Sequence, residues 1–260
     1  MNVLVTGHKG FIGSEVYSLL SERGHSVTGF DLGDELQQKK YDYIAHFAAR
    51  TLIRLSKEKP YEYFLDNMGL TMRIIELSRT QNSKLIFPTS GSIAKPTNPY
   101  SLSKKQAIEW IDLYRDLYGL DSYVLKLFNI YGETSRKGAV YLFCKSAATG
   151  EAATIYGNGD HKRDYTHVSD IAKFVLRIVE GEVRTGSYEL GTGVGTSVNQ
   201  LLKLVEGISG KKITTKHENY ILDEAEELYA KEPALTDYVK IQDGVKRVYR
   251  SISNIDRNVR

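Results

Sequence analysis

The chain has 260 residues, with 35 basic (Lys and Arg) and 32 acidic (Asp and Glu) side chains and a formal net charge of +3. This length allows one large or two small domains with a real core, and the balanced charge gives no reason to expect nucleic acid or an anionic membrane as a partner. The single cysteine, Cys144, excludes an internal disulfide framework and a multi-cysteine zinc site, so we expect no metal and, with no leader or apolar span in the sequence, a cytoplasmic protein.

The first half of the chain predicts strands that alternate with helices. Short runs rich in Val, Ile and Leu predict buried strands, and longer runs with apolar residues three or four positions apart predict helices. The expected strands are 2–6, 26–30, 43–47, 84–87 and 122–127, and the expected helices are 11–23, 60–81 and 100–118. This alternation indicates an α/β fold with a Rossmann-type, doubly wound parallel sheet.

The pattern becomes looser after Gly132. We expect a helix over 169–180 and a strand over 187–190, flanked by loop-rich segments over 133–164 and from Gly210 onward. The division we expect is a dinucleotide-binding Rossmann domain over 1–132, completed by 164–194, and a smaller C-terminal substrate lobe made of 133–163 and 195–260. Open α/β sheets bind ligands at the carboxyl ends of their strands, where we place this lobe.

Three glycines, Gly7, Gly10 and Gly13, lie between the first expected strand and the first expected helix. A side chain there would obstruct the tight turn, the approach of the backbone to a pyrophosphate and the packing of helix on strand. The helix N-terminus then offers amide donors to phosphates. Asp31 follows 18 residues after Gly13, at the end of the second strand, where a carboxylate accepts ribose hydroxyls and repels a 2′-phosphate. The pattern predicts NAD rather than NADP, although an ordinary strand–helix turn is the alternative.

Tyr100 and Lys104 lie four residues apart at the start of the helix 100–118 and therefore share one face. A free phenol, with a pKa near ~10, is a poor base at neutral pH, and an ammonium one turn away together with a cationic nicotinamide would lower that pKa. Ser90 follows the strand 84–87 and could hydrogen-bond the substrate oxygen that Tyr100 deprotonates. Taken alone, Tyr100 and Lys104 also fit a surface pair, and Ser90 also fits a Ser/Gly turn.

Further motifs follow in order along the chain: His46–Ala49, Asn67–Thr71, Phe128–Gly132, Gly157–Gly159, Arg163–Asp170 and Tyr188–Gly193. With them, the chain resembles the extended short-chain dehydrogenase/reductases, in particular the NAD-dependent nucleotide-sugar epimerase/dehydratase group that includes UDP-glucose 4-epimerase. The resemblance runs from Met1 to about Val205.

The resemblance implies a role for each candidate residue. The residues that would line the NAD site are Gly7, Gly10, Phe11, Ile12, Gly13, Asp31, Phe47, Ala48, Ala49, Asn67, Tyr100 and Lys104. Ser90, Tyr100 and Lys104 would be catalytic, and Ser90, Asn129 and Arg163 would bind the nucleotide-diphosphate sugar. A guanidinium such as that of Arg163 can hold phosphate oxygens with two parallel hydrogen bonds. The resemblance also implies a homodimer formed through the helix 100–118.

Two loops are shorter than the family pattern. Only ten residues separate Asp31 from Asp42, so a strand usual near the adenine is missing. Only nine separate Ser90 from Tyr100, and Ala94-Lys95 replaces the usual Tyr-Gly. We expect a more open adenine end and a trimmed loop over the sugar.

The residues after Ser90 favour one reaction. By the same resemblance, sugar dehydratases carry Asp-Glu where this chain has Gly91 and Ser92. We therefore expect redox chemistry at C4: Tyr100 takes the hydroxyl proton, hydride passes to NAD⁺ and returns to the other face of a transient 4-keto sugar, and Lys104 holds the nicotinamide ribose. The prediction is an NAD-dependent epimerase. The alternatives are an NAD-dependent nucleotide-sugar dehydratase or reductase, and a dinucleotide-binding sensor without turnover.

Overall fold

Two units make up the chain in the computed structural model, which describes residues 1–260 except 32, 38, 92, 94–95, 220–224 and 259–260. Unit 1 comprises Met1–Leu127 and Ile171–Glu189, and unit 2 comprises Phe128–Asp170 and Leu190–Arg260. Compared with the boundaries expected from the sequence, the segments 128–132, 164–170 and 190–194 belong to unit 2.

A six-stranded sheet in the order β10-β5-β4-β3-β1-β2 forms the centre of unit 1. Its strands are β1 (Asn2–Thr6), β2 (Ser26–Phe30), β3 (Tyr43–His46), β4 (Lys84–Ser90), β5 (Ser122–Leu127) and β10 (Gly186–Leu190). The four pairings from β2 to β5 are parallel, which confirms the expected Rossmann-type α/β sheet. Between Phe30 and Tyr43 the described residues form no strand, in agreement with the shortened connection.

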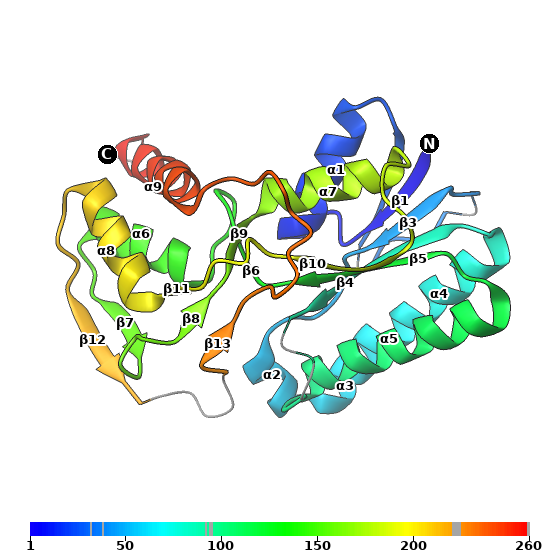
Figure 1. The fold of residues 1–260 in the computed structure, drawn as a ribbon, viewed down its shortest axis with the longest axis horizontal. Coiled ribbons are helices and arrows are strands. Elements are labelled where there is room, and N and C mark those ends of the chain that lie inside the picture. The colour runs from blue at the N-terminus through cyan, green and yellow to red at the C-terminus, as the bar shows by residue number, and fades with distance from the viewer. Residues whose placement is uncertain (32, 38, 92, 94–95, 220–224, 259–260) are drawn as a thin grey trace. The chain divides into compact units, whose positions relative to one another are not determined.

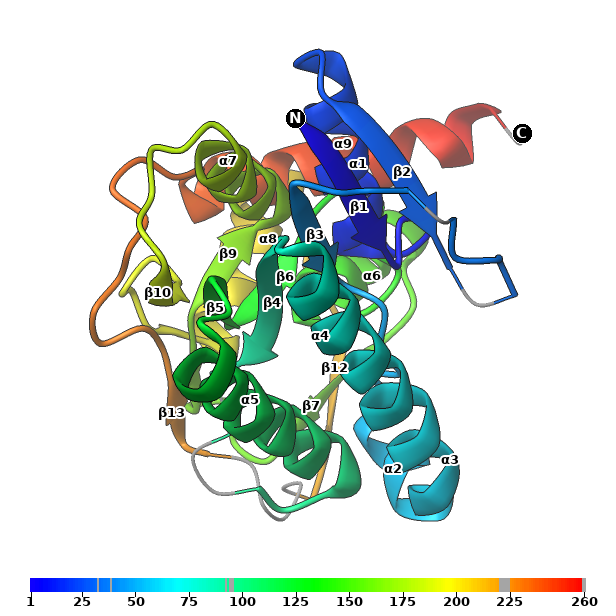
Figure 2. The ribbon, with the colours of Figure 1, turned by 90° about the vertical axis from the view of Figure 1, so that its right-hand side faces the viewer.

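Helices cover both faces of this sheet. Figures 1 and 2 show α1 (Phe11–Glu22) and α7 (Val168–Val179) on one face, and α4 (Leu70–Gln81) and α5 (Pro99–Tyr118) on the other. The strand β1 accordingly has Val3, Leu4 and Val5 fully buried, as expected for a parallel strand covered on both sides. The helix expected over 60–81 is instead α3 (Pro60–Phe64), a π-helical turn η1 (Leu65–Gly69) and α4, and a short helix α2 (Ile53–Glu58) precedes them.

A capping box fixes the start of α5. The Asn98 side chain accepts from the Ser101 amide at 2.9 Å, the Ser101 hydroxyl accepts from the Asn98 amide at 3.4 Å, and Pro99 occupies the first turn. Proline and a polar cap are both favoured at a helix start. This local chemistry places Tyr100 in the first turn of α5.

The described residues of unit 2 form three helices and three small sheets. The helices α6 (Ala139–Thr149), α8 (Val198–Ser209) and α9 (Ile241–Asn258) pack on one another. The paired strands are β6 (Asn129–Tyr131) with β9 (Tyr165–His167); β7 (Ala153–Tyr156) with β12 (Thr215–Glu218); and β8 (Lys162–Arg163) with both β11 (Thr196–Ser197) and β13 (Glu227–Leu228). No described helix is long and apolar enough to cross a membrane.

The expectation of loop-rich segments over 133–164 and from Gly210 onward is wrong, because α6, β7 and α9 lie in them. In α9, Val245, Val248 and Ile252 are buried at helical spacing. Gly244 obscured this pattern, since glycine weakens a helix in isolation. Its place is explained by packing: a Cβ on Gly244 would lie 2.7 Å from Cζ of Tyr131.

Candidate active site

The glycine turn lies against the loop that follows β3. Gly7 has a φ of +72°, and a Cβ there would lie 2.7 Å from the Ala48 amide nitrogen and 2.8 Å from the Phe47 carbonyl carbon. A Cβ on Gly13 would lie 2.7 Å from the carbonyl carbon of Gly7. Both positions therefore require glycine, for the turn and for helix–strand contact as predicted. Because β2 and β3 lie on opposite sides of β1, this is where the strand order reverses and open α/β sheets bind ligands.

The start of α1 has no side-chain cap among the described residues. The cap position is Gly10, and the first turn of the helix contains no acidic residue. The amides of Phe11, Ile12 and Gly13 have no partner within the helix, as in any first turn, and they carry the positive end of the helix dipole. Asp31 follows β2 and its Oδ2 accepts from the Lys9 amide at 3.1 Å. The turn, the uncapped helix and the carboxylate fit the pyrophosphate and adenosine ribose of NAD.

A buried histidine beneath the turn was missed as a site residue, although its motif was noted. His46 ends β3, and hydrogen bonds join its Nδ1 to Oγ1 of Thr6 at 2.7 Å and its Nε2 to Oγ1 of Thr71 at 3.0 Å. The Thr6 hydroxyl also accepts from the Ala48 amide at 3.1 Å. This chain of contacts holds the loop Phe47–Ala49 against the glycine turn. Burial and the Lys104 ammonium lower the pKa of His46 to about 3.

That shift predicts a loss of stability in acid. His46 is neutral in the folded chain, whereas the unfolded chain protonates it below its ordinary value of 6.5. The unfolded state then binds more protons, so the free energy of unfolding falls as the pH drops from 6.5 toward 3. Between about pH 7.5 and pH 4.5 we expect the free energy of unfolding of wild type to fall by about 2–3 kcal/mol more than that of His46→Gln, measured by urea unfolding.

His217→Gln, which removes an exposed histidine of unit 2, is the matched control. It should follow the wild-type pH dependence. If the free energy of unfolding fell equally in acid for His46→Gln and for wild type, His46 would not titrate in this way.

The predicted cofactor residue Asn67 anchors the backbone near the turn. It lies in η1 and is buried; its Oδ1 accepts from the Arg50 amide at 2.8 Å and its Nδ2 donates to the Arg50 carbonyl at 3.1 Å. The structure thus brings Asn67 next to Ala49, where it positions backbone. The π turn that presents it is of a kind often found at functional sites.

Lys104 connects the start of α5 to the end of β4. Its side chain is buried, its Nζ donates to the Pro88 carbonyl at 3.1 Å, and it lies 4.5 Å from the centroid of the Phe87 ring. Pro88 precedes Ser90, the last residue of β4, by two positions. The Lys104 ammonium is therefore held at the end of β4 that carries Ser90, and Tyr100 lies one helical turn before Lys104 in α5.

Burial sets the acidities of Tyr100 and Lys104. Burial, with a smaller contribution from Tyr63, raises the pKa of Tyr100 to about 12, and burial lowers the pKa of Lys104 to about 8. The phenolate expected from the sequence depends on two positive charges, Lys104 and a cationic nicotinamide. The Lys104 ammonium donates to the Pro88 carbonyl, and desolvation of the phenol dominates the pKa of Tyr100. A phenolate at Tyr100 requires a further positive charge.

The remaining predicted residues, Asn129 and Arg163, lie in unit 2. The Asn129 amide donates to the carbonyl of Asp164, the residue after Arg163, at 3.0 Å. Nδ2 of Asn129 is buried with no hydrogen-bond partner among the described residues, which is unusual for an amide donor. Arg163 is buried and its Nη1 donates to the carbonyls of Lys162 at 2.9 Å and Glu226 at 3.4 Å. Both side chains offer donors suited to an anion.

A buried carboxylate next to Arg163 was also missed. Asp164 has no exposed surface. Its Oδ1 accepts from the Thr192 amide at 2.9 Å and hydroxyl at 2.7 Å, and its Oδ2 accepts from the amides of Gly193 at 2.9 Å and Ala230 at 3.2 Å. Four donors satisfy one carboxylate, which ties three distant segments together beside Arg163. Their convergence depends on the fold and could not be deduced from spacing.

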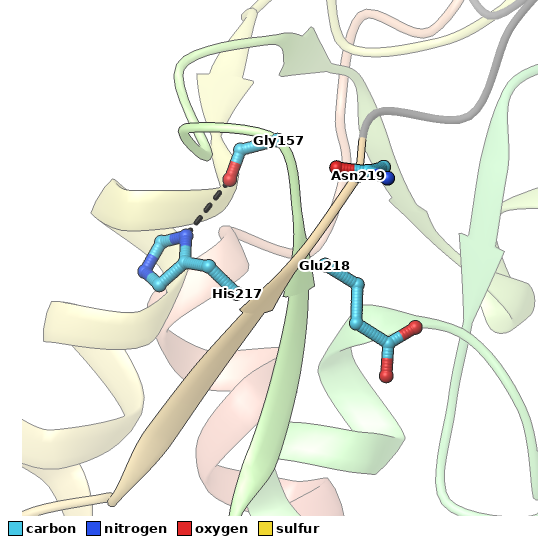
Figure 3. A pocket seen from close by; sticks show the side chains of 4 residues that line it. All are labelled: Gly157, His217, Glu218 and Asn219. Atoms are coloured by element: carbon cyan, nitrogen blue, oxygen red, sulfur yellow. Dashed lines mark hydrogen bonds between the residues drawn. The ribbon is translucent and has the colours of Figure 1, made fainter.

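A separate open pocket lies at the β7–β12 edge of unit 2. Gly157, His217, Glu218 and Asn219 line its volume of about 730 Å³, and a hydrogen bond of 2.8 Å joins His217 Nδ1 to the Gly157 carbonyl (Figure 3). Of its residues only Gly157 belongs to a motif identified in the sequence. Among the described residues, no three His, Cys, Asp or Glu side chains gather to hold a metal ion.

Comparisons with known proteins show which family and which fold the chain is similar to. The model of the "NAD dependent epimerase/dehydratase family" matches residues 3–191. The UDP-glucuronate 4-epimerase of Thermodesulfobacterium geofontis is 26% identical, over 94% of each chain. The Thermus thermophilus UDP-glucose 4-epimerase, solved with NAD, shares the fold with a TM-score of 0.84 at 24% identity, over 97% of this chain and 99% of the other. An NAD-dependent NDP-hexosamine 5,6-dehydratase of tunicamycin biosynthesis also shares it, with a TM-score of 0.85 at 18% identity, over 97% and 98%.

Proposed function

Because the chain belongs to the NAD-dependent epimerase/dehydratase family, we propose that it is an epimerase that inverts C4 of a nucleotide-diphosphate sugar through a transient 4-keto intermediate. One observation carries the proposal beyond the family. Lys104, on the same helical face as Tyr100, donates to the Pro88 carbonyl beside Ser90. The three side chains expected to handle one hydroxyl proton thus come from one helix start and one strand end.

In this proposal each residue has a distinct task. When bound, NAD⁺ supplies a hydride acceptor and a positive charge. Tyr100 takes the proton of the C4 hydroxyl, and Ser90 donates a hydrogen bond to the same oxygen. Lys104 positions the cofactor ribose and, with a pKa lowered to about 8 by burial, still carries its charge at neutral pH. Asp31 binds the adenosine ribose, and the amides at the start of α1 bind the pyrophosphate.

The proposal assigns the diphosphate of the substrate to unit 2. Asn129 contributes the buried Nδ2, which has no partner among the described residues, and Arg163 contributes its guanidinium. A phosphate gives both groups charge-assisted hydrogen bonds, which are stronger than neutral ones. This is the chemistry expected for a nucleoside diphosphate substituent on the sugar.

A dehydratase is the less favoured reaction. Removing water from a sugar requires an acid–base group beyond the one that handles the C4 hydroxyl. The residue after Ser90 is Gly91, and the next, Ser92, lies outside the described residues but has no carboxylate. The chain lacks the Asp-Glu pair at these two positions, and this favours epimerisation.

Product analysis tests the function. UDP-glucose and UDP-glucuronate are incubated separately with the protein and NAD⁺. The products are separated by chromatography, and their molecular masses are measured by mass spectrometry. We expect an epimer of unchanged mass from at least one sugar, with no net absorbance from NADH. A product lighter by one water would indicate a dehydratase, and stoichiometric NADH would indicate a dehydrogenase.

Arg163→Ala should weaken binding of the reacting UDP-sugar by about 1.5–3 kcal/mol, roughly 10- to 150-fold in Kd, because a charge-assisted contact to phosphate is lost. NAD affinity should change less than about twofold. Isothermal titration calorimetry measures both. Lys162→Ala removes a neighbouring exposed cation, paired with Glu227 at 3.0 Å, and is the matched control. An equal loss of NAD affinity in Arg163→Ala would contradict the substrate role.

We further propose a homodimer formed through α5. Leu113, Leu117 and Tyr118 are exposed on this helix, whereas Ile111 is fully buried in the core of unit 1. Trp110, 42% exposed, extends this apolar surface. The same helix carries both positive and negative side chains, in the ion pairs Lys105–Glu109 and Arg115–Asp112. Such a surface suits a second copy of itself.

Light scattering should therefore give twice the chain mass of 29.3 kDa. Leu117→Lys should give the monomer mass, and Leu142→Lys, on an exposed residue of α6, should not. A monomer mass for wild type would contradict the dimer.

A further inference from the structure

Three residues of unit 1 form a closed set of contacts beside the expected ribose site. Lys9, in the glycine turn, donates from Nζ to Oδ1 of Asp34 at 3.0 Å and to Oδ2 at 3.2 Å. Oδ2 of Asp34 also accepts from the Asp31 amide at 2.8 Å, and the Asp34 amide donates to the Asp31 carbonyl at 3.0 Å. The Lys9 amide completes the set by donating to Oδ2 of Asp31 at 3.1 Å.

This arrangement matters for the choice between NAD and NADP. A carboxylate at the end of the second strand accepts the ribose hydroxyls of NAD, and a nearby basic side chain is what accommodates the 2′-phosphate of NADP. The chain has both: Asp31 is the carboxylate, and Lys9 is a cation on the adjoining turn. Asp34 engages the Lys9 ammonium with both of its oxygens, and the charges of the three residues sum to −1.

The Asp34 carboxylate keeps this role across the neutral pH range. Hydrogen bonds from the Lys9 ammonium and then the Asp31 amide hold the pKa of Asp34 below its ordinary value. The Lys9 and Asp34 side chains are 60% and 34% exposed, and pairs this exposed contribute little to stability. Substitutions at Asp34 should therefore leave the fold intact.

We propose that Asp34 is a specificity-determining residue, which excludes NADP by neutralising Lys9 next to the Asp31 carboxylate. The inference rests on the use of NAD by this chain and adds a second acidic residue to the selection that Asp31 alone predicts. Asp34 acts by occupying the cation that a 2′-phosphate would otherwise attract.

The test compares cofactor affinities, independently of turnover. NAD⁺ and NADP⁺ are titrated by calorimetry into wild type, Asp34→Asn, Glu35→Gln and the double variant Lys9→Gln/Asp34→Asn. Asparagine keeps an oxygen for the Asp31 amide and removes the charge. Glu35→Gln removes one charge from the next residue, which is exposed and makes no described contact with Lys9.

Wild type should bind NAD⁺ more tightly than NADP⁺. Asp34→Asn should tighten NADP⁺ by at least about fivefold, the scale of one charge in a water-exposed site, and change NAD⁺ by less than about twofold. Glu35→Gln should leave the ratio of the two affinities near that of wild type, and the double variant should lose the gain.

Three results would overturn the proposal: an unchanged ratio in Asp34→Asn, an equal gain in Glu35→Gln, or a gain that persists without Lys9. Each of these leaves the proposed function standing as long as wild type binds NAD⁺. Failure of wild type to bind either dinucleotide would overturn the proposed function together with this proposal.

Discussion

Tyr100→Phe should lower kcat by at least about 100-fold while the affinities for NAD and for the sugar nucleotide stay nearly unchanged. The ring and its packing remain, and only the oxygen that we propose accepts the C4 hydroxyl proton is lost. A general acid–base group contributes about 10²–10⁴-fold, so removal of this one should dominate the rate. Single-turnover kinetics and calorimetry measure the two effects separately.

Tyr63→Phe is the matched control. Tyr63 is buried on the neighbouring helix α3, and its hydroxyl donates to the Leu52 carbonyl at 2.8 Å. A negative charge on Tyr63 would raise the pKa of Tyr100. Its loss should cost about 1 kcal/mol of stability and change kcat by less than about threefold. Full activity in Tyr100→Phe would exclude Tyr100 as the base.

The raised pKa of Tyr100, about 12, makes the pH dependence informative. In the proposed mechanism, the charges of Lys104 and bound NAD⁺ together favour the phenolate. The activity of wild type should then rise with pH through an apparent pKa well below 12. In Lys104→Met this rise in activity should occur at higher pH. Lys104→Met should also weaken NAD binding, because the same ammonium positions the cofactor ribose.

Asp164→Ala should lower the free energy of unfolding by about 3–5 kcal/mol and abolish measurable binding of the sugar nucleotide. The substitution leaves three amides and one hydroxyl, in buried or part-buried residues, without the carboxylate that accepts from them. It also opens a cavity in a region so closely packed that a Cβ on Gly191 would lie 2.8 Å from the Ala230 Cβ. Arg163 depends on this segment for its position. Asn129 depends on it too, because its amide donates to the Asp164 carbonyl.

Urea unfolding and calorimetry with the UDP-sugar test this expectation. Asp164→Asn keeps one acceptor oxygen and should lose less stability. Asp160→Ala removes an exposed carboxylate of the same segment, bonded to the side chains of Asn158 and Asn199, and should cost less than about 1 kcal/mol. Wild-type binding by Asp164→Ala would contradict its role in positioning Arg163.

The elements of the sheet could be predicted from sequence because each has a local signal. Val3–Val5 form an uninterrupted apolar run. The glycines of the turn after it are three residues apart, a spacing that few other kinds of turn require. None of the helices α6, α8 and α9 of unit 2 was predicted. Glycines and polar residues interrupt their patterns, and Gly244 is explained only by the side chain of Tyr131, more than a hundred residues away.

The site shows the same division. Spacing and family resemblance are enough to propose Gly7, Asp31, Tyr100 and Lys104 as site residues, whereas the partners that fix them are distant in sequence. Lys104 donates to the Pro88 carbonyl, and burial raises the pKa of Tyr100 to about 12. Solvent exclusion depends on the assembled structure, so no spacing rule could give it.

One measurement tests epimerisation at C4 most directly. The UDP-sugar that reacts is prepared with deuterium at C4 and converted in ordinary water with NAD⁺, and the product is examined by NMR spectroscopy. The account predicts a C4 epimer that retains deuterium at the inverted carbon, because the hydride removed from C4 is returned to C4. Loss of the deuterium to solvent, or an unchanged configuration at C4 in a product that has lost water, would contradict it.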